Sequence, residues 1–262
     1  MENEKIKETD LVQSLVKGLM VIRAFSEENP ELTISEAAKI TGLSRPATRR
    51  ILLTLTHLGY LHHSKTGSFS LTPKILSLGF SYISSKRIWT ALTPFLEQLS
   101  DQVQESTSIS VLDGDEIVYV ARVATKKIMS VALNVGSRLP AYATSMGQVL
   151  LAHLPEDKLE TYLAETTLKR YTDKTIIDTG KLRERLSSIK EKGYVIINEE
   201  LEVGLNSIAA PLRNNEGKVV AAINVSIHSS KIGDIAQIER NLVPYLLETA
   251  KAISNEIANV AL

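Results

Sequence analysis

The pattern of apolar and polar positions divides the chain into a helical N-terminal part and a longer part that mixes strands with helices. Apolar residues recur at helical spacing from Leu11 to Phe25 and from about Arg45 to Leu58, and a short helix between them ends at Gly42. Two short extended runs, YLHHS and SFSLT, then flank the turn residues KTG, which is typical of a β-hairpin. Three helices followed by a hairpin predict a winged helix-turn-helix domain.

The ends of these helices carry side chains that suit helix termini. Thr33 and Glu36 have the spacing of a capping box, and Ser44 is a candidate N-cap for the third helix. A helical wheel predicts that the buried side of the third helix consists of Ala47, Ile51, Leu55 and Leu58. On that wheel Arg45 and Arg49 lie next to each other on the outer side.

The part after the hairpin predicts an α+β domain. Pro73 begins a linker helix over residues 73–87, and one helix is expected from about Ile88 to Val103. The strands TSISVL, EIVYVARV and IMSVALNV should form an antiparallel meander, followed by a helix over TSMGQVLLAHL and two more helices. YVIIN, NSIAAPL and VVAAINVSI are further strands, and one helix is expected from about Lys231 to Val260. The resulting division is a disordered N-terminus at 1–10, a winged helix-turn-helix domain at 11–72, the linker at 73–87, and an α+β domain at 88–262.

Charge is distributed unevenly, although the formal net charge is zero. Between Ala37 and Leu96 there is no Asp or Glu. The same stretch contains eight Lys and Arg residues, namely Lys39, Arg45, Arg49, Arg50, Lys65, Lys74, Lys86 and Arg87. A basic stretch around a helix-turn-helix indicates a DNA partner, because the phosphates attract cations and the major groove accepts one helix. We predict base contacts by Arg45, Thr48 and Arg49, and phosphate contacts by Ser44, Arg50 and Lys65.

Several function classes find no support in the sequence. The chain has no cysteine, which excludes disulfides and thiolate metal sites, and its five histidines form no HExxH-like pair. The acidic turn DGDE from Asp113 to Glu116 lacks the further ligands of a calcium loop, and no nucleophile elbow or phosphate-binding glycine loop is present. We therefore expect no metal, no cofactor and no enzyme activity. No signal peptide or membrane-length apolar run occurs, so a cytoplasmic protein without a membrane partner is expected.

One place in the second domain has the features of a small-molecule site. The stretch ATSMG at 143–147 begins a helix, and free amide groups at a helix N-terminus attract an anion. Ser207, Asn224 and Ser226 lie among aliphatic residues on the closing strands. Polar residues in such positions are also explained by bonds to the backbone, so a ligand site and a purely structural role both remain open.

The stretches SLVKGLMVIRAF, LTISEAAKITGLSRPATRRILLTLTHLGYL, GSRLPAYATSMGQVLLAHL and GYVIINEELEVGLNSIAAPL, in this order, resemble the IclR family of bacterial transcription regulators. More narrowly, VQSLVKGLMVIRAF and RLPAYATSMG look like the branch that controls aromatic-acid catabolism through the β-ketoadipate pathway. The resemblance implies a winged-helix DNA-binding domain at 11–72 and a GAF-like effector-binding and oligomerisation domain at 88–262. It also implies a homodimer or dimer of dimers on a near-palindromic operator. It also implies protocatechuate or a neighbouring metabolite as the effector.

The resemblance further implies which residues contact the effector. Family contacts map onto the list Ser145, Met146, Ile197 or Asn198, Ser207, Asn224 and Ser226. The family pattern has Arg where this chain has Gln148 and Asn206. Either Arg122 or Arg138 therefore meets the effector carboxylate instead, or the effector is a different one. The alternatives are a regulator that responds to a non-aromatic acid, an enzyme with an appended DNA-binding domain, and an architectural DNA-binding protein without a ligand.

Overall fold

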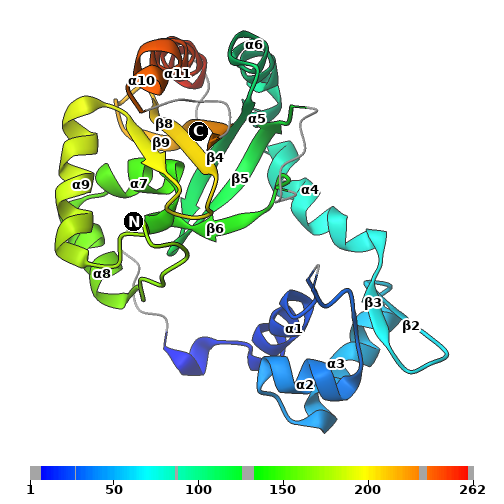
Figure 1. Cartoon of the computed structure of the whole chain (residues 1–262). Coiled ribbons are helices and arrows are strands. Elements are labelled where there is room, and N and C mark those ends of the chain that lie inside the picture. Colours follow the sequence, from blue (N-terminus) through cyan, green and yellow to red (C-terminus); the bar gives the residue numbers. More distant parts are fainter. Residues whose placement is uncertain (1–6, 27, 86–87, 126–132, 230–234, 259–262) are drawn as a thin grey trace. The chain divides into compact units, whose positions relative to one another are not determined.

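The computed structural model in Figure 1 describes residues 7–26, 28–85, 88–125, 133–229 and 235–258. These residues separate into two units, Met1–Ser85 and Lys86–Leu262, and each has its own hydrophobic core. The N-terminal stretch predicted to be disordered falls partly outside the described residues, and Glu8–Asp10 form a short 3-10 helix.

The N-terminal unit is the predicted winged helix-turn-helix. Its elements are α1 (Gln13–Arg23), β1 (Glu31–Leu32), α2 (Ile34–Thr41), α3 (Arg45–His57), β2 (Leu61–His63) and β3 (Phe69–Leu71). The capping box forms as expected, because the Thr33 amide donates to Glu36 Oε2 at 2.8 Å and the Glu36 amide donates to Thr33 Oγ1 at 3.4 Å. Strand β1 was not predicted, since two residues show no periodicity; it pairs with β3 and widens the hairpin to three strands.

The linker begins with a 3-10 turn at Pro73–Ile75 and continues as α4 (Leu76–Ser85), while residues 86–87 lie outside the described part of the chain. The C-terminal unit contains one antiparallel sheet in the order β6-β5-β4-β9-β8-β7. Its strands are β4 (Ser106–Asp113), β5 (Glu116–Val123), β6 (Arg138–Pro140), β7 (Val195–Asn198), β8 (Leu205–Arg213) and β9 (Val219–His228). The observed α+β class agrees with the prediction.

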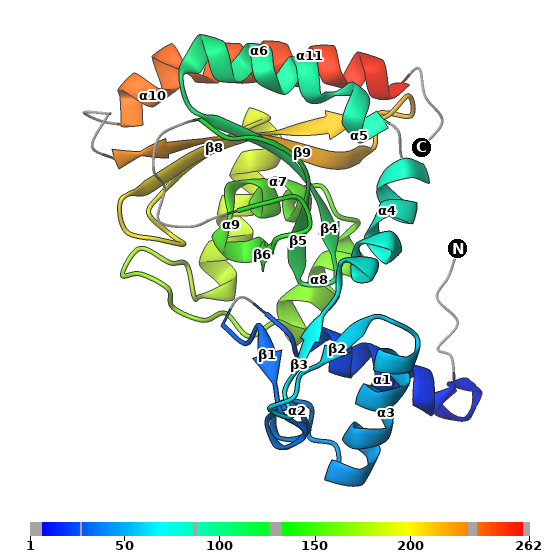
Figure 2. The same cartoon turned by 90° about the vertical axis from the view of Figure 1, so that its right-hand side faces the viewer.

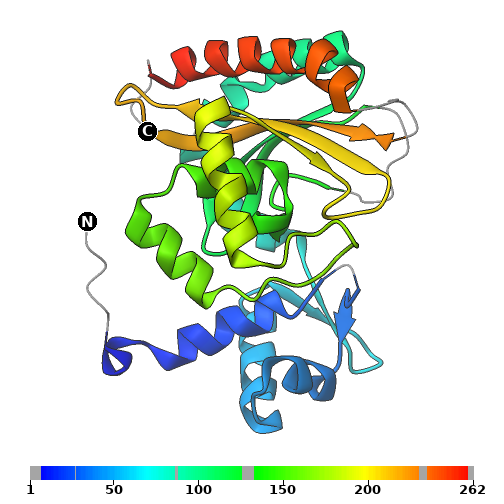
Figure 3. The same ribbon diagram turned by 60° about the vertical axis from the view of Figure 1, so that its left-hand side comes forward.

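Helices cover both faces of this sheet, as Figures 2 and 3 show. On one face lie α5 (Ile88–Ala91), α6 (Thr93–Val103), α10 (Ile235–Asn241) and α11 (Val243–Ala258); on the other lie α7 (Ser145–Ala152), α8 (Glu156–Glu165) and α9 (Thr179–Lys192). Side chains along a strand alternate between the two faces. On β9, Ile223 and Val225 therefore join the first core, while Ala222 joins the core around α7 and Asn224 points to the same side.

Three predicted elements differ from those observed. The helix expected at 88–103 is interrupted, and a new helix begins at Thr93. The helix expected at 231–260 falls partly outside the described residues, and within 235–258 it is interrupted, with a new helix beginning at Val243. Pro94 and Pro244 stand directly after these starts, and proline has no amide hydrogen to continue the preceding helix. The strand predicted at 128–135 lies mostly outside the described residues, and residues 133–135 are not a strand; β6 pairs with β5 instead.

Candidate DNA interface and effector cavity

The exposed surface of α3 is cationic. Arg45, Arg49 and Arg50 are exposed, and the first turn of the helix contains no acidic residue. Ser44 caps the helix by accepting a hydrogen bond from the Ala47 amide at 3.4 Å, which leaves its hydroxyl hydrogen available to a phosphate. A helix with this surface matches the width and the charge of the major groove.

Thr48, predicted to contact bases, does not lie on this surface. Its side chain is fully buried, and its hydroxyl donates to the Ser44 carbonyl oxygen at 3.1 Å. Two of the three buried residues of α3, Thr48 and Leu52, lie one position later in the sequence than the predicted Ala47 and Ile51. Both α1 and α2 pack against this helix, so its buried side is set by two neighbours. Leu52 is thus buried, and Leu58 is 49% exposed.

The tip of the wing is stabilised by hydrogen bonds of two serines, Ser64 and Ser68. The Ser64 amide donates to the Ser68 carbonyl oxygen at 2.8 Å, and the Ser64 and Ser68 hydroxyls are 2.8 Å apart. Ser68 also donates to Glu31 on β1 at 2.8 Å. Lys65, between these serines, is exposed at the tip, where a wing meets a phosphate.

One more cation, Lys17, lies beside α3, and the sequence pattern did not indicate it. Lys17 of α1 and Arg50 of α3 line one groove together with Ser14 and Thr54. The acid-free stretch begins only at Ala37, so charge counting along the chain did not connect Lys17 with the α3 surface.

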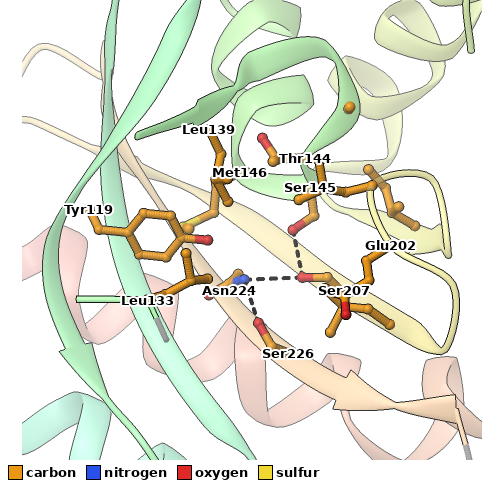
Figure 4. Close-up of a pocket in the computed structure, with 14 residues that line it drawn as sticks. Tyr119, Leu133, Leu139, Thr144, Ser145, Met146, Glu202, Ser207, Asn224 and Ser226 are labelled. Carbon is orange, nitrogen blue, oxygen red and sulfur yellow. Dashed lines mark hydrogen bonds between the residues drawn. The ribbon is translucent and has the colours of Figure 1, made fainter. Parts of the chain in front are cut away.

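In the C-terminal unit, a cavity of about 220 Å³ opens between α7, the strands β5, β8 and β9, and the loop after β7. Figure 4 shows its lining, which consists of Tyr119, Leu133, Leu139, Ala143, Thr144, Ser145, Met146, Ile197, Leu201, Glu202, Leu205, Ser207, Asn224 and Ser226. The walls are mainly aliphatic. The volume is below the roughly 300–1,000 Å³ of sites for drug-sized molecules, which fits a ligand with a single ring.

A network of small polar groups forms one wall of the cavity. Ser145 and Ser207 hydroxyls lie 2.7 Å apart, and Asn224 Nδ2 donates to both Ser207 Oγ and Ser226 Oγ at 3.1 Å (Figure 4). The register of β8 and β9 places Ser207 directly opposite Ser226, which explains why residues far apart in sequence meet here. Each of these side chains is buried.

The first turn of α7 contacts this network through Ser145. Thr144 is the N-cap and accepts a hydrogen bond from the Gly147 amide at 3.2 Å. The amides of Ser145 and Met146 in the first turn have no carbonyl partner within the helix, and the helix dipole favours an anion there. The cavity contacts this turn, because Thr144, Ser145 and Met146 all line it.

Comparison with known proteins agrees with both parts of this description. Residues 14–64 match the IclR helix-turn-helix domain, and residues 80–255 match the C-terminal domain of bacterial IclR transcriptional regulators. The chain belongs to the IclR family. It is therefore a DNA-binding transcription regulator with a domain of the effector-binding type.

Three individual proteins are similar to this chain over most of its length. The Pca regulon regulatory protein of Pseudomonas putida is 39% identical, and the match covers 95% of this chain and 85% of that protein. A transcriptional regulator from Rhodococcus is 44% identical with a TM-score of 0.82, covering 96% of this chain and all of that one. An IclR homologue from Microbacterium hydrocarbonoxydans, solved in complex with 4-hydroxybenzoate, is 25% identical with a TM-score of 0.80, covering 94% and 100%.

Of the predicted effector contacts in this IclR-family chain, Ser145, Met146, Ser207, Asn224 and Ser226 meet in the cavity. Asn198 does not line it. Strand alternation turns the neighbouring Ile197 inward instead, and the Asn198 side chain accepts a hydrogen bond from Lys174 Nζ at 3.2 Å.

The two arginines expected to meet the effector carboxylate are held elsewhere. Arg138 forms ion pairs with Asp113 at 2.8 Å and Glu116 at 2.7 Å, at the turn between β4 and β5. Arg122 points to the same face of the sheet as Asn224, but its Nη1 donates to Ser108 Oγ at 3.0 Å and it does not line the cavity. Burial lowers the pKa of Arg122. Among the described residues, no Lys, Arg or His lines the cavity of this regulator.

The sequence pattern did not single out Tyr119, Glu202 or most of the apolar wall. Tyr119 lies on β5 two residues after Ile117, and both point to the side of α7. Only this two-residue period indicated the direction of Tyr119. Glu202 and Leu201 belong to the loop between β7 and β8, whose path is set by tertiary contacts.

That loop is held to the α7 side by a buried carboxylate. Glu200 accepts hydrogen bonds from Gln148 Nε2 at 2.8 Å and from Arg185 Nη1 at 3.1 Å. Burial raises the pKa of Glu200, and Arg185 acts in the opposite direction. Gln148, where the family resemblance led us to expect arginine, therefore supports the cavity wall without entering it.

No group of three or more His, Cys, Asp or Glu side chains within the described ranges has the geometry of a metal site. Over the same ranges, no helix combines the length and apolar character that crossing a membrane requires.

Proposed function

We propose that this IclR-family regulator binds a small aromatic acid in the α7 cavity and thereby controls genes of aromatic-acid catabolism in the β-ketoadipate pathway. The observation that carries the proposal is the cavity itself, in which aliphatic walls of single-ring size lead to the first turn of α7. Support also comes from the relative that regulates a Pca regulon and from the homologue solved with 4-hydroxybenzoate.

The test is the shift in melting temperature of the purified full chain across a panel of aromatic and aliphatic acids. A ligand at about 100 times its Kd stabilises the folded state by about 2.7 kcal/mol, which gives a clear shift. We expect shifts with protocatechuate or a pathway neighbour. A response to aliphatic acids alone would refute the aromatic effector while leaving regulation by an acid intact.

We also propose the contacts with the operator. Arg45 and Arg49 read base edges in the major groove, and Ser44, Arg50 and Lys65 bind phosphates. Their exposure around one helix and its wing supports this assignment.

We further propose that the protein acts as a homodimer or dimer of dimers on a near-palindromic operator. The outward side of α1 and the residues before it expose a set of apolar side chains, namely Leu11, Val12, Leu15, Val16, Leu19 and Met20. A two-fold partner would bury this surface and would match the two-fold symmetry of a palindrome. Sedimentation equilibrium of the wild type and of Leu15→Glu tests this; a wild-type monomer at micromolar concentration would contradict it.

Finally, we propose that the cavity binds its ligand without turnover and that the regulator acts in the bacterial cytoplasm, where its DNA target lies. The cavity brings together hydroxyl, amide and apolar groups with one carboxylate, that of Glu202, and no paired acid and base is present among its described lining residues. Chromatography of the acid after prolonged incubation with the protein should recover it unchanged.

A further inference from the structure

The side chain of Tyr119 is buried and carries a hydroxyl group that is not used in the internal hydrogen bonds of the described fold. The side chain is only 4% exposed, lines the cavity, and directs its hydroxyl toward the middle of the space (Figure 4). Within the described part of the chain, no hydrogen bond joins this hydroxyl to another group. Buried tyrosines normally find a partner.

Other buried tyrosines of this domain follow that rule. The Tyr142 hydroxyl donates to the Lys169 carbonyl oxygen at 2.8 Å, and the Tyr162 hydroxyl accepts from the Tyr142 amide at 3.2 Å. A hydroxyl without a partner destabilises a buried site, so the one on Tyr119 points to a group that arrives with the ligand.

A second unsatisfied group lies in the same part of the wall. Asn224 Nδ2 is used twice, toward Ser207 and Ser226, while Asn224 Oδ1 is buried with no hydrogen-bond partner among the described residues. Ser207 has one hydroxyl hydrogen, which it donates to the Val225 carbonyl oxygen at 3.2 Å, and this makes the amide of Asn224 the donor in their contact. Both unsatisfied groups belong to strands of the sheet, on β5 and β9.

The ionisation of Tyr119 fits a neutral partner. Burial raises the pKa of its hydroxyl to about 12, with the nearby Arg122 acting in the opposite direction, so the phenol stays protonated at neutral pH. A neutral phenol both donates and accepts one hydrogen bond, as a ring hydroxyl on the ligand does.

The positions of the other lining residues set the orientation that such a ligand would take in the cavity. Figure 4 shows Tyr119 on one side and Ser145, at the first turn of α7, on the other. Leu139 and Met146 are among the apolar residues that line the space. A carboxylate at α7 and an aromatic ring against the apolar wall then leave the far edge of the ring facing Tyr119.

We infer that Tyr119 is a specificity residue that recognises a hydroxyl group on the ring of the aromatic acid, so that the effector is a hydroxybenzoate rather than benzoate. The inference rests on the proposed function, because it takes the carboxylate to be bound at α7. It assigns the two ends of one ligand to two separate elements of the fold.

The test measures by calorimetry the affinity of the full chain for benzoate, 3-hydroxybenzoate, 4-hydroxybenzoate and 3,4-dihydroxybenzoate. In the wild type, the best hydroxylated acid should bind on the order of tenfold or more tightly than benzoate, since benzoate leaves the Tyr119 hydroxyl without a partner. In Tyr119→Phe that ratio should fall toward one, and benzoate should bind at least as tightly as it does to the wild type.

Tyr194→Phe is the matched control, because it removes a hydroxyl that bonds to Glu239 and does not line the cavity. It should keep the wild-type ratio. If the wild type binds benzoate as tightly as the hydroxybenzoates, or if Tyr119→Phe keeps the wild-type ratio, the inference is overturned while the aromatic-acid sensor stands. If the wild type binds none of the four acids, the proposed function fails and the inference fails with it.

Discussion

At the scale of single residues, the protein uses the same kinds of side chain for binding and for internal support. His153 is an example of support. Its Nε2 lies 3.1 Å from Arg213 Nη2 and its Nδ1 lies 2.8 Å from the Val149 carbonyl oxygen. A guanidinium only donates, so Nε2 accepts and the hydrogen of the neutral ring is on Nδ1. Burial lowers the pKa of His153.

This arrangement predicts a pH dependence of stability. With a folded pKa below the ordinary value of about 6.5, the contribution of His153 is fully present above that pH. It is lost as the pH falls through the lowered folded pKa, because the unfolded chain then takes up the proton more readily. The urea midpoint of the wild type should therefore drop on moving below pH 6.5.

The comparison with His153→Gln isolates this effect. Glu200 has a raised pKa, so its contribution has the opposite sign and is lost as the pH rises through that pKa. Both proteins retain Glu200, and the difference between their midpoints reports His153 alone. A constant difference between pH 5 and 8 would show that His153 does not titrate within this range.

The arginines of α3 give a second prediction at this scale. Arg49→Ala should weaken operator binding by about 1–3 kcal/mol at its base pair and leave random DNA less affected. Lys65→Ala should weaken both DNAs about equally and reduce the salt slope by about one. Fluorescence titrations at several salt concentrations measure both effects, and equal losses on the two DNAs for Arg49→Ala would remove its role as a base reader.

At the scale of elements, the position of α7 depends on a close approach to the backbone before it. A Cβ atom built on Gly147 would lie 2.1 Å from the Ala141 carbonyl oxygen and 2.4 Å from its Cα. Neither atom belongs to a flexible side chain, so any larger residue must shift the helix. The first turn of α7 reaches the cavity only because residue 147 is glycine.

Gly147→Ala should therefore lower the free energy of unfolding by about 1–3 kcal/mol and weaken effector binding, because the first turn is displaced. The matched control is Gly18→Ala, another glycine within a helix, where an added Cβ meets nothing within 4 Å. Gly18→Ala should leave effector binding unchanged. Calorimetric binding and urea unfolding measure the two variants, and wild-type behaviour of Gly147→Ala would show that α7 adjusts without loss.

At the scale of the whole molecule, the binding of the acid and the binding of DNA are two equilibria on one chain. The effector alters DNA affinity only if it binds the DNA-competent arrangement and the alternative arrangement with different affinities. We expect the helix that joins the two units, α4, to transmit this difference. Activation and repression both fit this scheme, since they differ in where the operator lies.

Linkage then makes a quantitative prediction. If a saturating aromatic acid changes operator affinity by some factor, typically about 5- to 150-fold, saturating operator must change the affinity for the acid by the same factor. Both factors come from titrations of one preparation at one salt concentration. Unequal factors would show that another equilibrium, such as a change in oligomeric state, accompanies binding.

The sequence by itself determined those features that depend on neighbouring residues. The capping box of Thr33 and Glu36 and the cationic α3 follow from side-chain chemistry over a few positions, and so does the helix start at Thr144. Two-residue alternation also fixes which way a strand side chain points, and the serines and the asparagine singled out on the closing strands line the cavity.

Tertiary structure decided what depends on partners far apart in the chain. Thr48 is buried in the domain in which α1 and α2 both pack against α3, and ion pairs with Asp113 and Glu116 hold Arg138 away from the cavity. Only the folded sheet brings Tyr119 opposite α7 with its hydroxyl unpaired. A sequence pattern records which residue types are present at which spacing. The direction of a helix face and the partner of a buried polar group are instead set by contacts between segments that the pattern does not relate.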